Sequence, residues 1–441
     1  MPKANFCKSL VLKESVILPG KSQQFLHSQD GVGATAGAKK GIMRQGKYAK
    51  YSVRVKFVAY GAVLAAVTTA LGSAGCAPPS KVCGYEIKYY YTQTEDNFTL
   101  GLRRYRPEFF SEDKDPVILC HGFSYNMLFW DLSEEASLPR YLAEGGYDVW
   151  LLSLRGAAPS SQPLNSAMRK LVHFHLDPEM LITITNRLRD LKMLDWSVDD
   201  HIFKDVPTAV RFVLQETGRE RVHWVGHSMG GMIMFAYLGH NPSKKAEQLN
   251  SLVAIAAPMV IFHPLNDPFD FLLKQQGALS LGSHILGSSV PATLGAILGD
   301  LNTPMDKLFY NSQNVHGATL RLLFQRAEEE MGPSQFKQLL EMVRTERFRS
   351  LDKTIDYTEK LREVTTPTLL LAGTVDNMAT PGAVRYAWRN LGSEDKDFRL
   401  FGRVNSQRND YGHNDLVIGE HARKEVYPAI LEWLKKHDAK K

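Results

Sequence analysis

A serine at position 228 lies in a short glycine-flanked segment with the spacing of a nucleophile motif. Residues 226–230 read Gly-His-Ser-Met-Gly; an apolar run over residues 221–225 precedes them, and an apolar, helix-like stretch over residues 232–238 follows. A strand, a sharp turn and a helix in this order present a serine hydroxyl at the tip of the turn. The glycines carry no Cβ atom, so the strand and the helix can approach closely. We predict that Ser228 is a nucleophile.

A serine hydroxyl attacks efficiently only when a base removes its proton and a third group orients that base. In motifs of this kind the acid and then the histidine follow the serine along the chain. Asp376 comes just after the apolar run 369–372, and His413 follows the last such run. We predict His413 as the general base and Asp376 as its orienting carboxylate. Asp410 and Asp415 are the alternatives to Asp376, although Asp415 is expected to cap the next helix or to brace the histidine loop.

The negative charge that develops on a substrate carbonyl oxygen needs fixed hydrogen-bond donors. The backbone N–H of Met229, directly after the nucleophile, is one predicted donor. The second is the backbone N–H of Phe123, in the loop that follows the apolar run 116–120. His121 in this loop is interpreted as a structural histidine without an acid–base role. His227, beside the nucleophile, is predicted to pack rather than to react.

The remaining apolar runs indicate the elements that position these residues. Two strand-like runs flank a polar turn and six shorter ones alternate with helical patterns, at residues 86–92, 98–105, 116–120, 147–154, 221–225, 252–256, 368–372 and 398–401. Short apolar strands that alternate with helices predict an α/β fold, with a mostly parallel central sheet and helices on both faces. This core is expected over residues 85–257 and 364–441.

The alternation stops over residues 258–363, where several segments are apolar or helical and amphipathic. We predict a helical cap or lid inserted here, after the sixth strand. The alternative is a set of extra structural helices that pack away from the site.

The N-terminal part has the pattern of an export segment. Residues 1–42 predict disorder, and Met43 is a candidate start of translation. A basic stretch, an apolar stretch over residues 57–74 and then Cys76 form a secretory signal pattern within residues 43–76. Cys76 resembles the lipidated cysteine of a bacterial lipobox, although Ser73 stands where leucine is usual.

Three interpretations of this segment stay open: a lipoprotein signal, an ordinary cleaved signal and a retained anchor, because about 18 apolar residues just suffice to span a bilayer. Each implies an exported catalytic part, with membrane association in the cell envelope of a bacterium when the segment is lipidated or retained.

Composition narrows the class of protein further. The 441 residues are 44% apolar and 23% charged, which is ordinary for a globular protein with a large core. The net charge of +6 is concentrated near the chain ends, so we predict no nucleic-acid partner. Four cysteines at uneven spacing predict neither a disulfide framework nor a zinc site, and Cys120 is expected to be buried. No metal-binding pattern or phosphate-binding loop is apparent, so no metal or cofactor is predicted.

Taken together, these motifs resemble the α/β-hydrolase superfamily, and most closely its acid-lipase branch with the related bacterial lipases and esterases. Three further segments are similar to that branch: residues 154–156, residues 194–209 and the histidine block at residues 411–419. The resemblance runs from about Tyr85 to the C-terminus, apart from the predicted cap. It implies the α/β-hydrolase fold and a serine hydrolase of carboxylic esters, with lipid or acylglycerol esters as substrates.

Other proteins of this fold need different residues at the elbow. Dehalogenases and many epoxide hydrolases place aspartate there, and polyester synthases and some thioesterases place cysteine, so Ser228 argues against these classes. A short-chain carboxylesterase and an acyltransferase stay open, because an alcohol can replace water as the acyl acceptor. A non-catalytic binding protein would usually have lost one of the three predicted catalytic residues, and all three are present.

Overall fold

The computed structural model describes residues 80–82, 84–108, 113–160, 195–240, 245–262, 306–329 and 331–438. The chain divides into the units Met1–Ala65 and Ala66–Lys441, and every described residue belongs to the second unit. The predicted export segment with Cys76 lies outside the described residues, as do residues 263–305 of the predicted cap. Over the described ranges, no helix is long and apolar enough to cross a membrane.

In this part of the chain, nine strands form one sheet in the order β1-β2-β3-β5-β4-β6-β7-β8-β9. Neighbouring strands are antiparallel from β1 to β5 and parallel from β5 to β9. The strand bounds are β1 Ser80–Val82, β2 Tyr85–Gln93, β3 Thr99–Pro107, β4 Val117–Cys120, β5 Val149–Ser153, β6 Val222–His227, β7 Leu249–Ile255, β8 Thr368–Gly373 and β9 Lys396–Phe401.

The eight predicted strands are all present, because their sequences match their places in the sheet. Strands β4 to β8 are buried along their whole length, as continuous apolar runs require. Cys120, at the end of β4, is fully buried, as predicted. Strand β1 lies just before Tyr85, near which the folded part was expected to begin, and pairs Ser80 with Ile87. Three residues, Ser-Lys-Val, are too short and polar to give a periodic signal.

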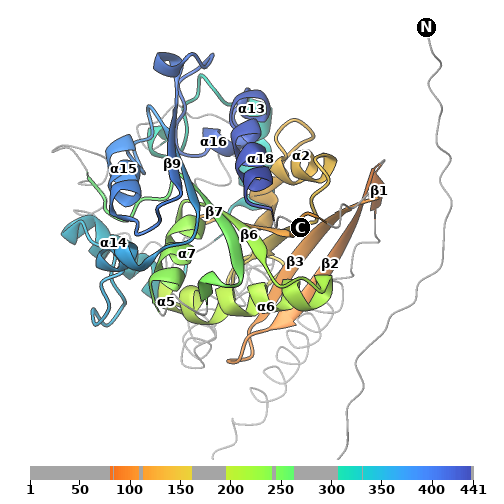
Figure 1. Cartoon of the computed structure of the whole chain (residues 1–441). Helices are drawn as coiled ribbons and strands as arrows, with labels where there is room; N and C mark the ends of the chain where they lie inside the picture. Colours follow the sequence, from red (N-terminus) through yellow and green to blue (C-terminus); the bar gives the residue numbers. More distant parts are fainter. Residues whose placement is uncertain are drawn as a thin grey trace, which may run out of the picture. The chain divides into compact units, whose positions relative to one another are not determined.

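Helices cover both faces of the sheet (Figure 1), which confirms the predicted α/β architecture. Helices α2 and α18 contact each other and pack on β3, β5 and β7, whereas α6 and α7 pack from the other side on β2, β6 and β7. The main bounds are α2 Leu138–Glu144, α5 Val198–Asp200, α6 Val206–Thr217, α7 Met229–Gly239, α15 Pro381–Asn390, α16 Asp415–Ile418, α17 Ala422–Glu425 and α18 Tyr427–Lys436, with short η1 Met127–Trp130, η2 His201–Asp205 and η5 Arg403–Asn405.

The described residues between β7 and β8 include several helical segments. They form α12 Asp306–Phe309, α13 Gly317–Leu322, η3 Leu323–Ala327, α14 Pro333–Thr345 and η4 Glu359–Glu363. The amphipathic segment expected near residues 318–324 is thus α13 with the start of η3. Whether this insertion serves as a cap over a substrate stays a prediction.

Candidate active site

Ser228 occupies the turn between β6 and α7. Its backbone has φ 51° and ψ −119°, a conformation that non-glycine residues rarely adopt. The turn is anchored by the Ser228 N–H, which donates to the carbonyl of Ile255 in β7 at 2.8 Å. A Cβ atom on Gly230 would collide with the carbonyl of Cys120, so only glycine fits there. The motif therefore has the strained strand–turn–helix geometry that its sequence predicts.

Asp376 and His413 meet at the same edge of the sheet, after β8 and β9. The Nδ1 atom of His413 lies 2.9 Å from the Oδ2 atom of Asp376, and both side chains are almost wholly buried. The other carboxylate oxygen accepts the backbone N–H groups of Met378 and Ala379, at 2.9 and 2.7 Å. These two bonds fix the carboxylate, which can only accept, so the Nδ1 atom of His413 donates to it.

No hydrogen bond joins the Ser228 hydroxyl to His413 within the described ranges. Ser228 and His413 are linked indirectly through His227, which precedes Ser228. His227 Nε2 donates to the carbonyl of His413 at 3.1 Å, and the ring centroids of the two histidines are 4.8 Å apart. Catalytic hydrogen bonds are often long without substrate and form when it binds. The structure therefore pairs Asp376 with His413 directly and places Ser228 at the same edge of the sheet.

The loop that carries Phe123 passes beside the elbow. A Cβ atom on Gly122 would lie 3.0 Å from the Cβ atom of Ser228, so a side chain at this position would crowd the turn, and glycine allows the close approach. Met229 is the first residue of α7, where backbone N–H groups have no partner inside the helix and the helix dipole favours negative charge. This is where the predicted donors, the N–H groups of Phe123 and Met229, would have to converge.

The two other histidines at this edge are buried and neutral. His121 donates from Nδ1 to the Gly122 carbonyl at 2.9 Å and accepts the Leu154 N–H on Nε2 at 3.1 Å, while burial lowers its pKa to about 4. Burial, followed by the proximity of His413, lowers the pKa of His227 well below its usual range. The burial of His121 and His227 supports the interpretation, drawn from the sequence, that these histidines are structural and have no acid–base role.

Asp415 braces the histidine loop rather than capping α16. Its carboxylate accepts the Gly412 N–H at 2.9 Å and the Asn311 N–H at 3.1 Å. Burial raises the pKa of Asp415 to about 7, and the carboxylate of Asp376 adds to the shift. The loop that holds His413 is thereby tied to the segment inserted between β7 and β8.

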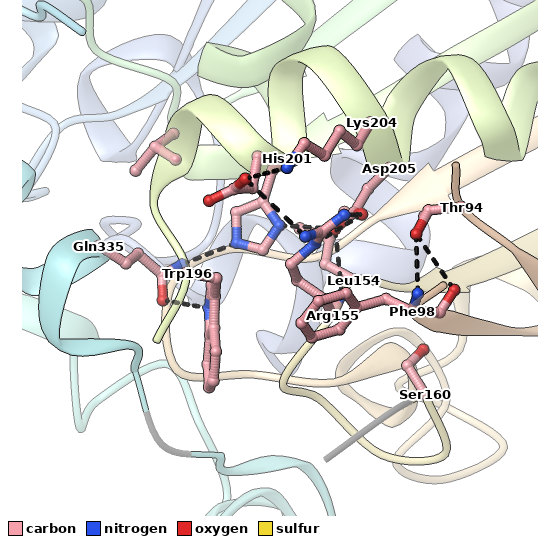
Figure 2. Close-up of polar contacts among 12 residues, drawn as sticks. Thr94, Phe98, Leu154, Arg155, Ser160, Trp196, His201, Lys204, Asp205 and Gln335 are labelled. Atoms are coloured by element: carbon pink, nitrogen blue, oxygen red, sulfur yellow. Dashed lines mark hydrogen bonds and ion pairs between the residues drawn. The ribbon is translucent and has the colours of Figure 1, made fainter. Parts of the chain in front are cut away.

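A buried polar network behind the elbow was not predicted (Figure 2). Arg155, after β5, binds Asp205 through Nε at 2.8 Å, and His201 Nδ1 lies 2.8 Å from the second oxygen of Asp205. Gln335 on α14 contacts His201 and Trp196. The sequence signal for part of this network was a histidine and an aspartate four residues apart on one helical face.

A second serine–histidine–aspartate set lies at the opposite edge of the sheet, at the start of β6. His223 contacts the Ser251 hydroxyl with Nδ1 at 2.9 Å and Asp438 with Nε2 at 3.1 Å. Tyr147 also donates to Asp438, at 2.6 Å. Ser251 and His223 have no exposed surface, so this set links the C-terminal segment to the sheet.

A comparison with known families identifies the fold. Residues 115–416 match the family model described as alpha/beta hydrolase fold, and the match includes the elbow, Asp376 and His413. The chain belongs to the α/β-hydrolase fold family. The family and fold expected from the sequence are thereby confirmed. In the described part, no group of three or more His, Cys, Asp and Glu side chains could hold a metal ion.

Several relatives in this family are named as lipases. A protein of Schizosaccharomyces pombe named as a probable lipase is 33% identical over 176 residues, 39% of this chain and 35% of that protein. Gastric triacylglycerol lipase of Rattus norvegicus is 32% identical over 189 residues, 41% of this chain and 43% of the lipase. Lipase 3 of Drosophila melanogaster is 24% identical over 390 residues, 80% of this chain and 91% of the lipase. This chain thus spans less than half the length of the first two.

Proposed function

We propose that this protein is a serine hydrolase of carboxylic esters that works through an acyl-enzyme on Ser228. The observation that carries the proposal is the 2.9 Å contact between His413 Nδ1 and Asp376, at the sheet edge where the strained Ser228 turn lies. A buried carboxylate that fixes the proton on Nδ1 leaves Nε2 as a base. The similarity to lipases supports the same reaction.

Attack begins when His413 accepts the hydroxyl proton of Ser228 and the freed oxygen adds to the ester carbonyl. The resulting oxyanion accepts the backbone N–H groups of Met229 and Phe123, and the N-terminus of α7 favours its charge. His413 then passes its proton to the departing alcohol, which leaves the acyl group on Ser228. Water completes the cycle by the same steps, with His413 again as the base.

We propose lipid or acylglycerol esters as the substrates. The lipase relatives support this choice. The predicted cap over residues 258–363, whose described part contains helices α12, α13 and α14, would bind the acyl chains. A short-chain carboxylesterase would prefer small soluble esters, and an acyltransferase would use an alcohol in place of water.

The test is hydrolysis of p-nitrophenyl esters from acetate to palmitate by the full chain, by Ser228→Ala and by Ser251→Ala as a matched control. We expect wild type to prefer long chains, Ser228→Ala to be inactive and Ser251→Ala to remain active. A preference for acetate would contradict the lipid substrate alone. Full activity in Ser228→Ala would contradict the mechanism.

We further propose that residues 43–76 direct export and that Cys76 becomes a lipidated N-terminus. The basic, apolar and small-residue order of this segment supports the proposal. Mass spectrometry of the protein purified from its own cells tests it, with Cys76→Ser as the control. An N-terminal peptide that begins at Cys76 and carries acyl chains is expected. A mature chain that retains residues 57–74 would contradict it.

A further inference from the structure

Gln335, near the start of helix α14, reaches from the inserted segment into the core behind the nucleophile. Its side-chain oxygen accepts the Trp196 indole N–H and the Gly332 backbone N–H, both at 3.1 Å. Its side-chain nitrogen lies 3.2 Å from His201 Nε2 and 3.2 Å from the sulfur of Met229. The residue is only 4% exposed, so four neighbours satisfy a buried amide completely.

These partners fix the direction of each hydrogen bond in the network around Gln335 (Figure 2). An indole N–H and a backbone N–H can only donate, so the atom of Gln335 that faces them is the oxygen. The nitrogen therefore donates to His201 Nε2 and to the Met229 sulfur. His201 must then carry its own proton on Nδ1 and donate it to Asp205, which Arg155 also binds. The amide has a single orientation that satisfies all its partners.

The contact with Met229 connects this network to the elbow. Met229 directly follows Ser228, whose backbone is strained, and strained conformations persist only when their surroundings hold them. A methionine side chain has three rotatable bonds and adapts readily to other positions. A buried donor on its sulfur limits that freedom and therefore limits movement of the Met229 backbone.

We infer that Gln335 is a positioning residue that holds Met229, and with it the predicted oxyanion-binding N–H, in its working position. The inference rests on the proposed function, because it assigns Gln335 a part in the same reaction. It also gives the inserted segment a task besides covering the site: helix α14 supplies a support for the nucleophile turn.

The same helix offers a matched control. Gln338 is also 4% exposed, accepts the Val198 N–H at 2.7 Å and donates to Asp199 at 2.8 Å. It binds the segment before α6 as Gln335 does, but no hydrogen bond connects it to Met229 or His201 within the described residues. Replacing either glutamine with methionine keeps similar volume and removes a buried amide.

The experiment compares Gln335→Met with Gln338→Met in the full chain, on an ester that wild type hydrolyses. Active sites are counted by complete labelling with a fluorophosphonate. We expect Gln335→Met to lower kcat per labelled site about 10- to 100-fold with KM changed less than about threefold, since small displacements of catalytic groups cost this much. We expect Gln338→Met to keep kcat within about threefold of wild type. We expect it to lose about as much thermal stability as Gln335→Met does.

Two further variants sharpen the result. Met229→Leu removes the sulfur acceptor, so adding Gln335→Met to it should lower kcat less than Gln335→Met does alone. Should Gln335→Met not fold, Gln335→Glu keeps both accepted hydrogen bonds, loses both donated ones and is expected to lower kcat similarly. Equal effects of the substitutions at 335 and 338, or an unchanged kcat at 335, would overturn the inference. Activity in Ser228→Ala would instead overturn the proposed function.

Discussion

A serine, a histidine and an aspartate, contributed by different segments, lie near each end of strand β6, and the two sets differ in an instructive way. At its start, His223 contacts both Ser251 and Asp438, so all three side chains are joined. At its end, His413 is hydrogen-bonded to Asp376, but in the described part of the chain no hydrogen bond joins His413 to the Ser228 hydroxyl. By side-chain hydrogen bonds alone, the first set is the more complete triad.

The backbone distinguishes the two sets. Ser251 lies inside strand β7 with no exposed surface, and its hydroxyl is fixed against His223. Ser228 lies on a strained turn, at the start of the buried 11-residue helix α7 and beside the glycine of the Phe123 loop. Their exposed fractions, 0% and 6%, differ little. We therefore propose that the strained turn and the N–H donors predicted beside it mark Ser228 as the nucleophile, whereas the set without them serves stability.

The largest expected contrast is between the two histidines. His413→Ala removes the base and should lower kcat/KM about 10⁴-fold or more. His223→Ala leaves buried partners unsatisfied and should lower the free energy of unfolding by about 2–4 kcal/mol, with kcat per active site nearly unchanged. Ester kinetics and urea denaturation of both variants measure this. Equal losses of activity would break the distinction between the two sets.

The aspartates should differ in the same direction. Asp376→Asn presents an amide to His413 and favours the wrong tautomer, so kcat should fall about 10³- to 10⁴-fold. Asp438→Asn weakens the bonds with His223 and Tyr147 and should cost about 1 kcal/mol of stability without a large change in kcat. Kinetics and thermal unfolding of the two variants decide. A large loss of kcat in Asp438→Asn would show that the two edges are coupled.

The smallest expected effect concerns Asp415, which braces the His413 loop and has no counterpart described beside Ser251. Because burial raises its pKa to about 7 in the folded state, the folded protein retains a proton that the unfolded chain releases near pH 4. The stabilisation from this proton is complete below about pH 4 and is lost as the pH rises through about 7.

Asp415→Asn cannot titrate, so its stability should depend less on pH. Between about pH 4.5 and pH 8, wild type should lose on the order of 1–3 kcal/mol more than the variant. Urea denaturation at both pH values measures the difference. Parallel pH profiles would contradict the assignment of this titration to Asp415.

Much of the catalytic edge was predictable from sequence because it depends on local patterns. Continuous apolar runs identify buried parallel strands, and the glycines around Ser228 identify the turn. Asp376 and His413 follow from their places after strands. The short strand β1 gave no signal, since three residues cannot establish a period.

The supporting contacts were not predictable, because they join segments far apart along the chain. Gln335 and His201 are separated by 134 positions, and nothing in the amphipathic pattern of α14 distinguishes Gln335 from Gln338. The contact of His223 with Asp438 likewise depends on where the C-terminal segment packs. Tertiary packing decides such pairs, and local periodicity contains no information about it.

We propose that Ser228, and not the better hydrogen-bonded Ser251, is the nucleophile. The most direct test is to treat the full chain with a fluorophosphonate and to locate the label by peptide mass spectrometry, in wild type and in His413→Ala. We predict a label on Ser228 alone, formed far more slowly in His413→Ala. A label on Ser251, or ester hydrolysis that persists while Ser228 stays unmodified, would contradict it.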